Sequence, residues 1–171
     1  LTGLVFLDIL VVGSVAFDSV ETPFGKKGDV LGGSATYFST AASFFTSVRL
    51  VAVVGDDFPA EHKKFLSERN IDRAGLQTQS GKTFRWKGQY GYDLNEAHTL
   101  ETQLNVFESF HPEIPEIYRT SPFVFLANID PHLQLEVLKQ VQRPRLVACD
   151  TMNFWIESKR DALVETLAHV D

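Results

Sequence analysis

The sequence has little cysteine, no excess of positive charge and no long uninterrupted apolar segment. Its one cysteine, Cys149, lies in the apolar stretch RLVAC without Cys or His neighbours at metal-ligand spacing, so we expect a buried structural thiol. The 16 Lys and Arg residues against 22 Asp and Glu residues give a formal net charge of −6. This balance argues against broad nucleic-acid binding but still permits a small anionic ligand. Cysteine usage fits a reducing compartment, and we expect a cytoplasmic location.

The sequence also lacks targeting signals and the motifs of several enzyme classes. The apolar beginning LTGLVFLDILVVGSVAF is broken by Asp8 and has no basic segment before it, so it does not resemble a signal peptide. It is too short and too interrupted to span a membrane. No G-x-G-x-x-G follows the first apolar run, which argues against a dinucleotide-binding domain. No G-x-S-x-G occurs, and the five histidines are scattered, which argues against a hydrolase.

Apolar runs alternate with amphipathic segments along most of the chain. With 171 residues and 44% hydrophobic residues, the chain is long enough for one domain with a sizeable core. The alternation predicts an α/β fold with strands buried on both faces. The predicted strand regions are 8–20, 48–55, 121–128 and 145–150, and the predicted helices are 34–46, 59–69, 130–142 and 159–170. On the first helix, we expect Ala35, Phe38, Ala42 and Phe45 to face the core.

The middle of the chain has a different pattern. From Gly81 to Phe107, aromatic residues alternate with polar ones, and ETPFGKKGDVL has the composition of a hairpin. We therefore expect a small antiparallel sheet inserted in two pieces, at about 20–31 and 82–107. Its apolar face needs a cover, either a ligand cleft or a second subunit, so a homodimer through this sheet is one expectation.

Two adjacent glycines, Gly32 and Gly33, precede the first helix. They could allow a tight turn with close packing, or they could let a ligand approach free N–H groups at a helix N-terminus. Asp18 and Asn128 follow apolar runs, where α/β sheets gather ligands, although both residue types also close turns. The residues alone do not decide between a structural and a ligand-binding role at these positions.

A family resemblance joins these features. The stretches VVGSVAFDSV, GGSATYFSTAASFF, RLVAVVGDDFP, NIDRAGL and DTMNFW, in this order, resemble the N-terminal part of ribokinase-like (PfkB-family) carbohydrate kinases over 8–171. The resemblance implies a doubly wound, mostly parallel sheet with a small β lid. It also implies transfer of the γ-phosphoryl group of ATP, with Mg²⁺, to a hydroxymethyl group of a sugar or nucleoside. Asp18, Gly32 and Gly33 match substrate-binding positions, and we expect Asn128 to face the substrate from the same rim.

Other positions match the family less closely. Asp150 and Asn153 resemble its phosphate region, but the spacing DTMN is one residue longer. Phe84 and Trp86 are candidates either for covering the substrate or for the core of the lid. Tyr37 stands near a position where ribokinase-type members often carry Asn. This departure, together with Ala16 in place of another Asn, points away from ribose and toward a nucleoside or modified sugar.

The family's catalytic elements have no counterpart in the chain. The resemblance places a Gly-rich anion hole and an aspartate base beyond Asp171, and we assign no metal ligand. Asn105–Glu108 matches the family's Asn-x-x-Glu motif by letters but lies at the end of the lid. We therefore expect a fragment that lacks the C-terminal half of a kinase, is inactive alone, and binds a small molecule but no nucleic acid or membrane. The alternative is a non-catalytic, degenerate kinase that binds a sugar or nucleoside.

Overall fold

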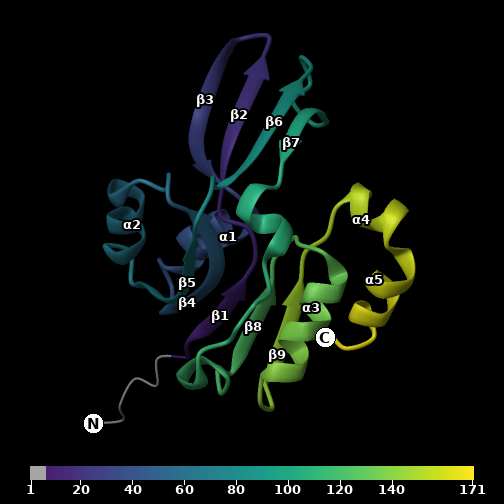
Figure 1. Cartoon of the computed structure of the whole chain (residues 1–171). Coiled ribbons are helices and arrows are strands. Elements are labelled where there is room, and N and C mark those ends of the chain that lie inside the picture. Colours follow the sequence, from purple (N-terminus) through teal and green to yellow (C-terminus); the bar gives the residue numbers. More distant parts are fainter. Residues whose placement is uncertain (1–6) are drawn as a thin grey trace.

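A computed structural model describes residues 7–171, so the first six residues of the apolar beginning lie outside the described residues. Five parallel strands form the main sheet in the order β5-β4-β1-β8-β9 (Figure 1). Their bounds are β1 Ile9–Val12, β4 Val48–Gly55, β5 Ile71–Gln79, β8 Phe123–Leu126 and β9 Leu146–Cys149. The strand order changes direction at β1, so the switch point, where α/β sheets bind ligands, lies between β1 and β8.

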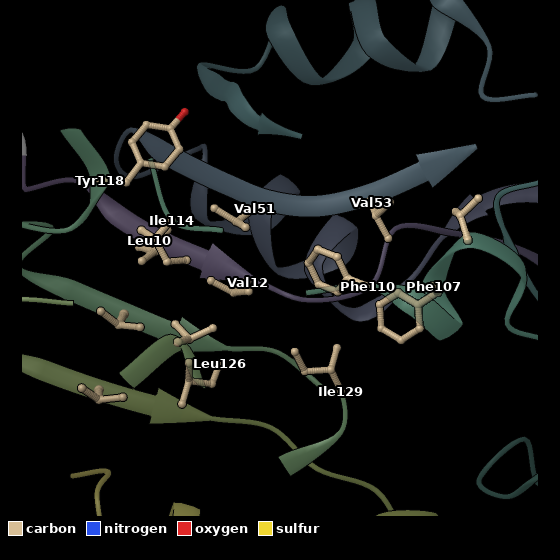
Figure 2. Packing of buried hydrophobic residues seen from close by; sticks show 14 residues of the cluster. Leu10, Val12, Val51, Val53, Phe107, Phe110, Ile114, Tyr118, Leu126 and Ile129 are labelled. Carbon is tan, nitrogen blue, oxygen red and sulfur yellow. The ribbon is translucent and has the colours of Figure 1, made fainter. Parts of the chain in front are cut away.

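Helices cover both faces of this sheet. Helices α1 (Ser34–Ala42) and α2 (Ala60–Ser67) contribute Ala35 and Leu66 to one buried cluster. The other cluster joins strand residues such as Val12 and Val53 to Phe107 and Phe110 (Figure 2). The elements on that second side are η1 (Asn105–Ser109), η2 (Glu116–Tyr118), α3 (Pro131–Gln140) and α5 (Arg160–Leu167), with α5 against α3. The expected α/β fold is therefore confirmed.

A second, four-stranded sheet rises beyond the main sheet and forms the lid (Figure 1). Its order is β3-β2-β6-β7, with bounds β2 Ala16–Thr22, β3 Gly25–Gly32, β6 Phe84–Tyr90 and β7 Ala97–Gln103. Both hairpins are antiparallel as expected, whereas the central β2–β6 pair that joins them is parallel. The lid therefore brings two distant parts of the chain side by side. Pairing of two copies through this lid stays a prediction.

The strand expected over 8–20 is in fact two strands. A Cβ at Gly13 would lie 2.5 Å from the Cβ of Ala127, so the chain can turn here only with glycine. Strand β1 ends at Val12, and from Ala16 the chain runs into the lid as β2. Asp18 consequently lies within a lid strand and not beyond the end of a core strand.

The first helix is shorter than expected. It ends at Ala42, and the next turn is tighter, because the N–H of Phe45 bonds to the carbonyl of Ala42 at 2.9 Å. Phe45 is 89% exposed, so its predicted place in the core was wrong. Ala35 is buried, and Phe38 packs against the same cluster, as predicted.

The sequence patterns missed strand β5, the short helix α4 (Asn153–Ser158) and the 3-10 helices η1 and η2. Strand β5 is an edge strand with charged and polar residues, so it lacks the apolar run of its neighbours. Cys149 is half-buried, with its pKa raised by burial and by Asp150. Among residues 7–171, the structure describes no helix with the length and apolar character needed to cross a membrane.

Candidate functional site

Asp18 is a half-buried carboxylate at the base of the lid. Burial raises its pKa, and a hydrogen bond from the backbone of Gly33 opposes this by lowering it. A Cβ at Gly32 would lie 2.0 Å from Asp18 Oδ2, so Gly32 leaves room for this carboxylate. With one backbone donor, Asp18 keeps acceptor positions free for hydroxyl groups.

The second glycine shapes the start of α1. Gly33 has φ 93°, and a Cβ there would lie 2.4 Å from the carbonyl oxygen of Ser14. Ser14 takes over the capping, since its Oγ accepts the N–H of Ser34 at 3.1 Å and its carbonyl accepts the N–H of Ala35 at 3.1 Å. Close packing against the backbone and the positive φ thus require glycine at position 33, whereas Gly32 leaves room for the Asp18 side chain. The backbone of Gly33 donates to Asp18.

Asn128 lies on the other side of the same helix start. Ser34 Oγ donates to the carbonyl of Asn128 at 3.3 Å, which joins the end of β8 to α1. The side-chain Oδ1 of Asn128 is buried and has no hydrogen-bond partner among the described residues. Asp18 and Asn128 therefore flank the N-terminus of α1, and the role of Asn128 stays a prediction.

Two tyrosines belong to the same rim. Burial raises the pKa of Tyr37, and the charges of Asp18 and Tyr90 raise it further, so the three side chains lie near one another. Tyr37 is 58% exposed. It also lines an apolar groove of about 550 Å³ with Leu31 and Phe65. Tyr90 lies in the 81–107 segment whose alternating aromatics predicted the second sheet, but the sequence pattern did not predict that it lies near Tyr37.

The two lid aromatics are engaged within the protein. Phe84 stacks on Phe107 with ring centroids 5.3 Å apart. Trp86 shares the lid face of Asp18, its partner in register, and donates Nε1–H to Thr99 Oγ1 at 3.1 Å. A Cβ at Gly88 would lie 2.0 Å from the Trp86 ring. These contacts favour a core role for Phe84, while Trp86 lies on the face of the lid that carries Asp18. That Trp86 covers a substrate stays a prediction.

Asp150 and Asn153 lie farther along the sheet, after β9, and both are exposed. The N–H of Asp150 bonds to the carbonyl of Leu126 at 2.8 Å. The structure does not bring either residue into contact with Asp18. Asn105, which begins the Asn-x-x-Glu lookalike, donates to the carbonyl of Thr83 at 3.0 Å and is a structural residue.

Gln134 is a residue that sequence reasoning missed. It is fully buried, and its Nε2 donates to the carbonyls of Leu126, Ala127 and Asp150 at 3.0–3.3 Å. One amide thus fixes the carboxyl ends of β8 and β9. Its signal in the sequence is only a polar residue on the inner face of a predicted helix.

Within residues 7–171, no group of three or more His, Cys, Asp or Glu side chains could hold a metal ion. We therefore assign no Mg²⁺ ligand to the described part of the chain. Ser14 caps the N–H groups of Ser34 and Ala35, so what the site offers is the half-buried Asp18 carboxylate and two tyrosines. These groups suit a neutral polyhydroxylated molecule with a planar part.

Comparisons with known proteins bear on the fold and the family resemblance of the chain. No protein-family model matches the chain. The chain is 29% identical over 168 residues to a cytidine kinase from Thermococcus kodakarensis, covering 96% of this chain and 60% of that protein. The chain thus spans about 60% of the length of this curated relative.

Solved structures show the same fold. A nucleoside kinase of Methanocaldococcus jannaschii, an archaeal member of the ribokinase family, matches with a TM-score of 0.73 at 18% identity, covering 96% of this chain and 59% of that one. A putative ribokinase II of E. coli matches with a TM-score of 0.77 at 13% identity, covering 96% and 60%. The resemblance to ribokinase-like kinases is confirmed, and the chain has a ribokinase-like fold with a parallel main sheet and a separate second sheet. Its match to the N-terminal part of these kinases stays a prediction.

Proposed function

We propose that this chain is the substrate-binding part of an ATP-dependent kinase that phosphorylates a hydroxymethyl group. The observation that carries the proposal is the Asp18 carboxylate, which is half-buried against Gly32 and accepts a hydrogen bond from the backbone of Gly33. A carboxylate of this kind accepts hydrogen bonds from two neighbouring hydroxyls and fixes a polyol in one orientation. ATP with Mg²⁺ would supply the phosphoryl group. No described residue is assigned to ATP or Mg²⁺, nor to the base that accepts the hydroxyl proton.

We further propose that the acceptor is a nucleoside and not a free pentose. Tyr37 stands near the position where ribokinase-type members often carry an Asn that would hydrogen-bond a sugar hydroxyl, and its ring lies near Asp18. A planar base can stack on such a ring. The similarity to a cytidine kinase supports the same class of acceptor.

The test uses the protein encoded by the complete reading frame that contains these 171 residues. Phosphate transfer from ATP would be measured with a panel of nucleosides, ribose and other sugars. We expect kcat/KM for at least one nucleoside to exceed that for ribose. Binding without transfer would favour the alternative of a degenerate binding protein, and equal rates on ribose and nucleosides would contradict the assignment of the acceptor.

Two variants sharpen this test. Asp18→Asn keeps the shape of the side chain but removes the charge, and we expect kcat/KM to fall by about 100-fold or more. Tyr37→Asn should lower the preference for nucleosides over ribose, because the exposed ring is replaced by a hydrogen-bonding amide. Phe45→Ala is a suitable control, since this exposed aromatic ring lies beyond the end of α1.

A further inference from the structure

The base of the lid is tied to the end of β4 by a short chain of hydrogen bonds. Gly55, the last residue of β4, donates its N–H to Thr83 Oγ1 at 3.0 Å. Thr83 donates both its hydroxyl and its N–H to Asp57 Oδ1 at 2.7 Å. A Cβ at Gly55 would lie 2.3 Å from the carbonyl oxygen of Gly81, so the two segments touch backbone to backbone. The lid strand β6 therefore starts from a point fixed on the main sheet.

Arg85 extends this connection across the lid. Its Nη2 donates to Asp57 Oδ2 at 2.8 Å, and its Nη1 donates to Asp29 Oδ1 at 2.7 Å. Asp57 follows a core strand, Arg85 belongs to β6 and Asp29 belongs to β3. A planar guanidinium can bond to two carboxylates at once, which a lysine cannot do in the same way. One side chain thus joins the main sheet to both hairpins of the lid.

The backbone at Asp29 is shaped for this contact. Asp29 has φ 50°, and the pairing of β2 with β3 shifts register between Asp18 and Val20. Its N–H bonds to Ser19 Oγ at 3.2 Å. An irregularity of this kind re-aims a side chain, and here the side chain is aimed at Arg85.

Arg85 also covers Phe17, the residue that precedes the candidate ligand-binding residue Asp18. Its guanidinium lies 4.8 Å from the ring centroid of Phe17, which is buried and packs against Phe58. Phe17 pairs in register with Arg85, and Asp18 pairs with Trp86 on the opposite face of the lid. Holding Phe17 from one side therefore fixes the strand that presents Asp18 on the other.

A second ion-pair group on the lid offers an internal comparison. Lys87, two residues after Arg85 on the same face, pairs with Glu21 at 3.1 Å, and Lys26 pairs with the same Glu21 at 2.8 Å. All three residues belong to lid strands. This group joins lid strands to one another and does not reach the main sheet.

We propose that Arg85 is a positioning residue: by bridging Asp57 and Asp29 over Phe17, it fixes the base of the lid on the main sheet and holds Asp18 in place. The role given to Asp18 rests on the proposed function. The fixing of the lid does not, and it can be measured without any ligand.

The test compares Arg85→Gln with the matched control Lys87→Gln in the full 171-residue chain. Amide hydrogen exchange would be followed in the lid strands and, as an internal reference, in β1 and β4. We expect Arg85→Gln to speed exchange at the start of β2 and β6 about tenfold while β1 and β4 stay protected. Lys87→Gln should leave the start of both strands unchanged. Equal exchange in the two variants would overturn the proposal.

A ligand titration gives the second readout, with cytidine and ribose as probes. Arg85→Gln should weaken binding of the probe that binds the unaltered chain by about tenfold, and Lys87→Gln should not. If the unaltered chain binds neither probe, the proposed function is in error, while the exchange result still decides the fixing of the lid. If Arg85→Gln fails to fold, Arg85→Lys takes its place, because an ammonium group keeps the charge but cannot bridge both carboxylates. Exchange in Arg85→Lys equal to that of the unaltered chain would overturn the proposal.

Discussion

The two faces of the lid base carry two aspartates with opposite environments. Asp18 is desolvated, has one backbone donor and has a raised pKa. Asp57 is also pushed toward a higher pKa by burial, but bonds from Thr83 and the ion pair with Arg85 outweigh burial and lower its pKa. Asp57 has several donors within the protein, and such a carboxylate is structural. Asp18 has few donors, so its burial costs stability and leaves it able to accept hydrogen bonds from a ligand.

Alanine substitutions at the two adjacent glycines should have the largest effects. One should mainly lower the stability of the fold, and the other should mainly lower ligand binding. Gly33→Ala places a Cβ against the backbone of Ser14 at a positive φ, so we expect a loss of about 3 kcal/mol in the free energy of unfolding. Gly32→Ala instead meets the Asp18 carboxylate, which can rotate away. Urea unfolding should show the larger loss for Gly33→Ala, while ligand binding should be lost in Gly32→Ala. Equal losses of stability would contradict this division.

Neutralising each aspartate should have opposite effects on stability. Asp57→Asn removes the charge that pairs with Arg85, and we expect a loss of about 2 kcal/mol in the free energy of unfolding. Asp18→Asn removes a charge that burial disfavours, so the stability should stay the same or rise. Denaturant unfolding at pH 7 checks both variants. A large loss of stability in Asp18→Asn would show that this carboxylate is structural as well.

The contributions of Asp57 and Asp18 to the free energy of unfolding should also change with pH in opposite directions. The pKa of Asp57 is lowered on folding, so its stabilising contribution is present above the unfolded value of 3.8 and is lost as the pH falls through the folded pKa. The pKa of Asp18 is raised, so its cost appears as the pH rises above 3.8 and is relieved in acid. Unfolding free energies of the two Asn variants, relative to the unaltered chain, should therefore diverge between acid and neutral pH. Parallel curves would argue against the assigned environments.

The smallest change in the free energy of unfolding is expected at Asp29, the more exposed of the two carboxylates that pair with Arg85. The Asp29 side chain is 70% exposed, and its ion pair is screened by water and salt. Asp29→Asn should change the free energy of unfolding by less than about 1 kcal/mol. A loss as large as that of Asp57→Asn would mean that the connection across the lid is stronger than solvent exposure allows.

The sequence predicted the main sheet well because its strands are apolar on both faces. Strands β4, β8 and β9 were visible as apolar runs, and the alternating aromatics around Trp86 marked the lid. Strand β5 was missed because an edge strand carries polar residues. The division of the first run at Gly13 was missed because it depends on contact with Ala127, more than a hundred positions away in the sequence.

The site was only partly predictable for the same reason. Asp18 and the two glycines were found by resemblance, and Tyr37 as a departure from it. Asp57 lies in the quoted stretch RLVAVVGDDFP and Arg85 in the lid segment 81–107, yet their connection appears only when β4 meets the lid. The letters Asp-Asp after a buried strand and Thr at the start of the lid are the signal that could have suggested it.

The most direct test is a calorimetric titration of the 171-residue chain and its Asp18→Asn variant with a panel of nucleosides and sugars, at a pH where Asp18 is ionised. If Asp18 is the ligand-binding carboxylate, the unaltered chain binds a nucleoside more tightly than ribose. The variant then melts at the same or a higher temperature but loses that binding. Equal binding by both proteins, or lost binding that merely follows lost stability, would contradict the assignment.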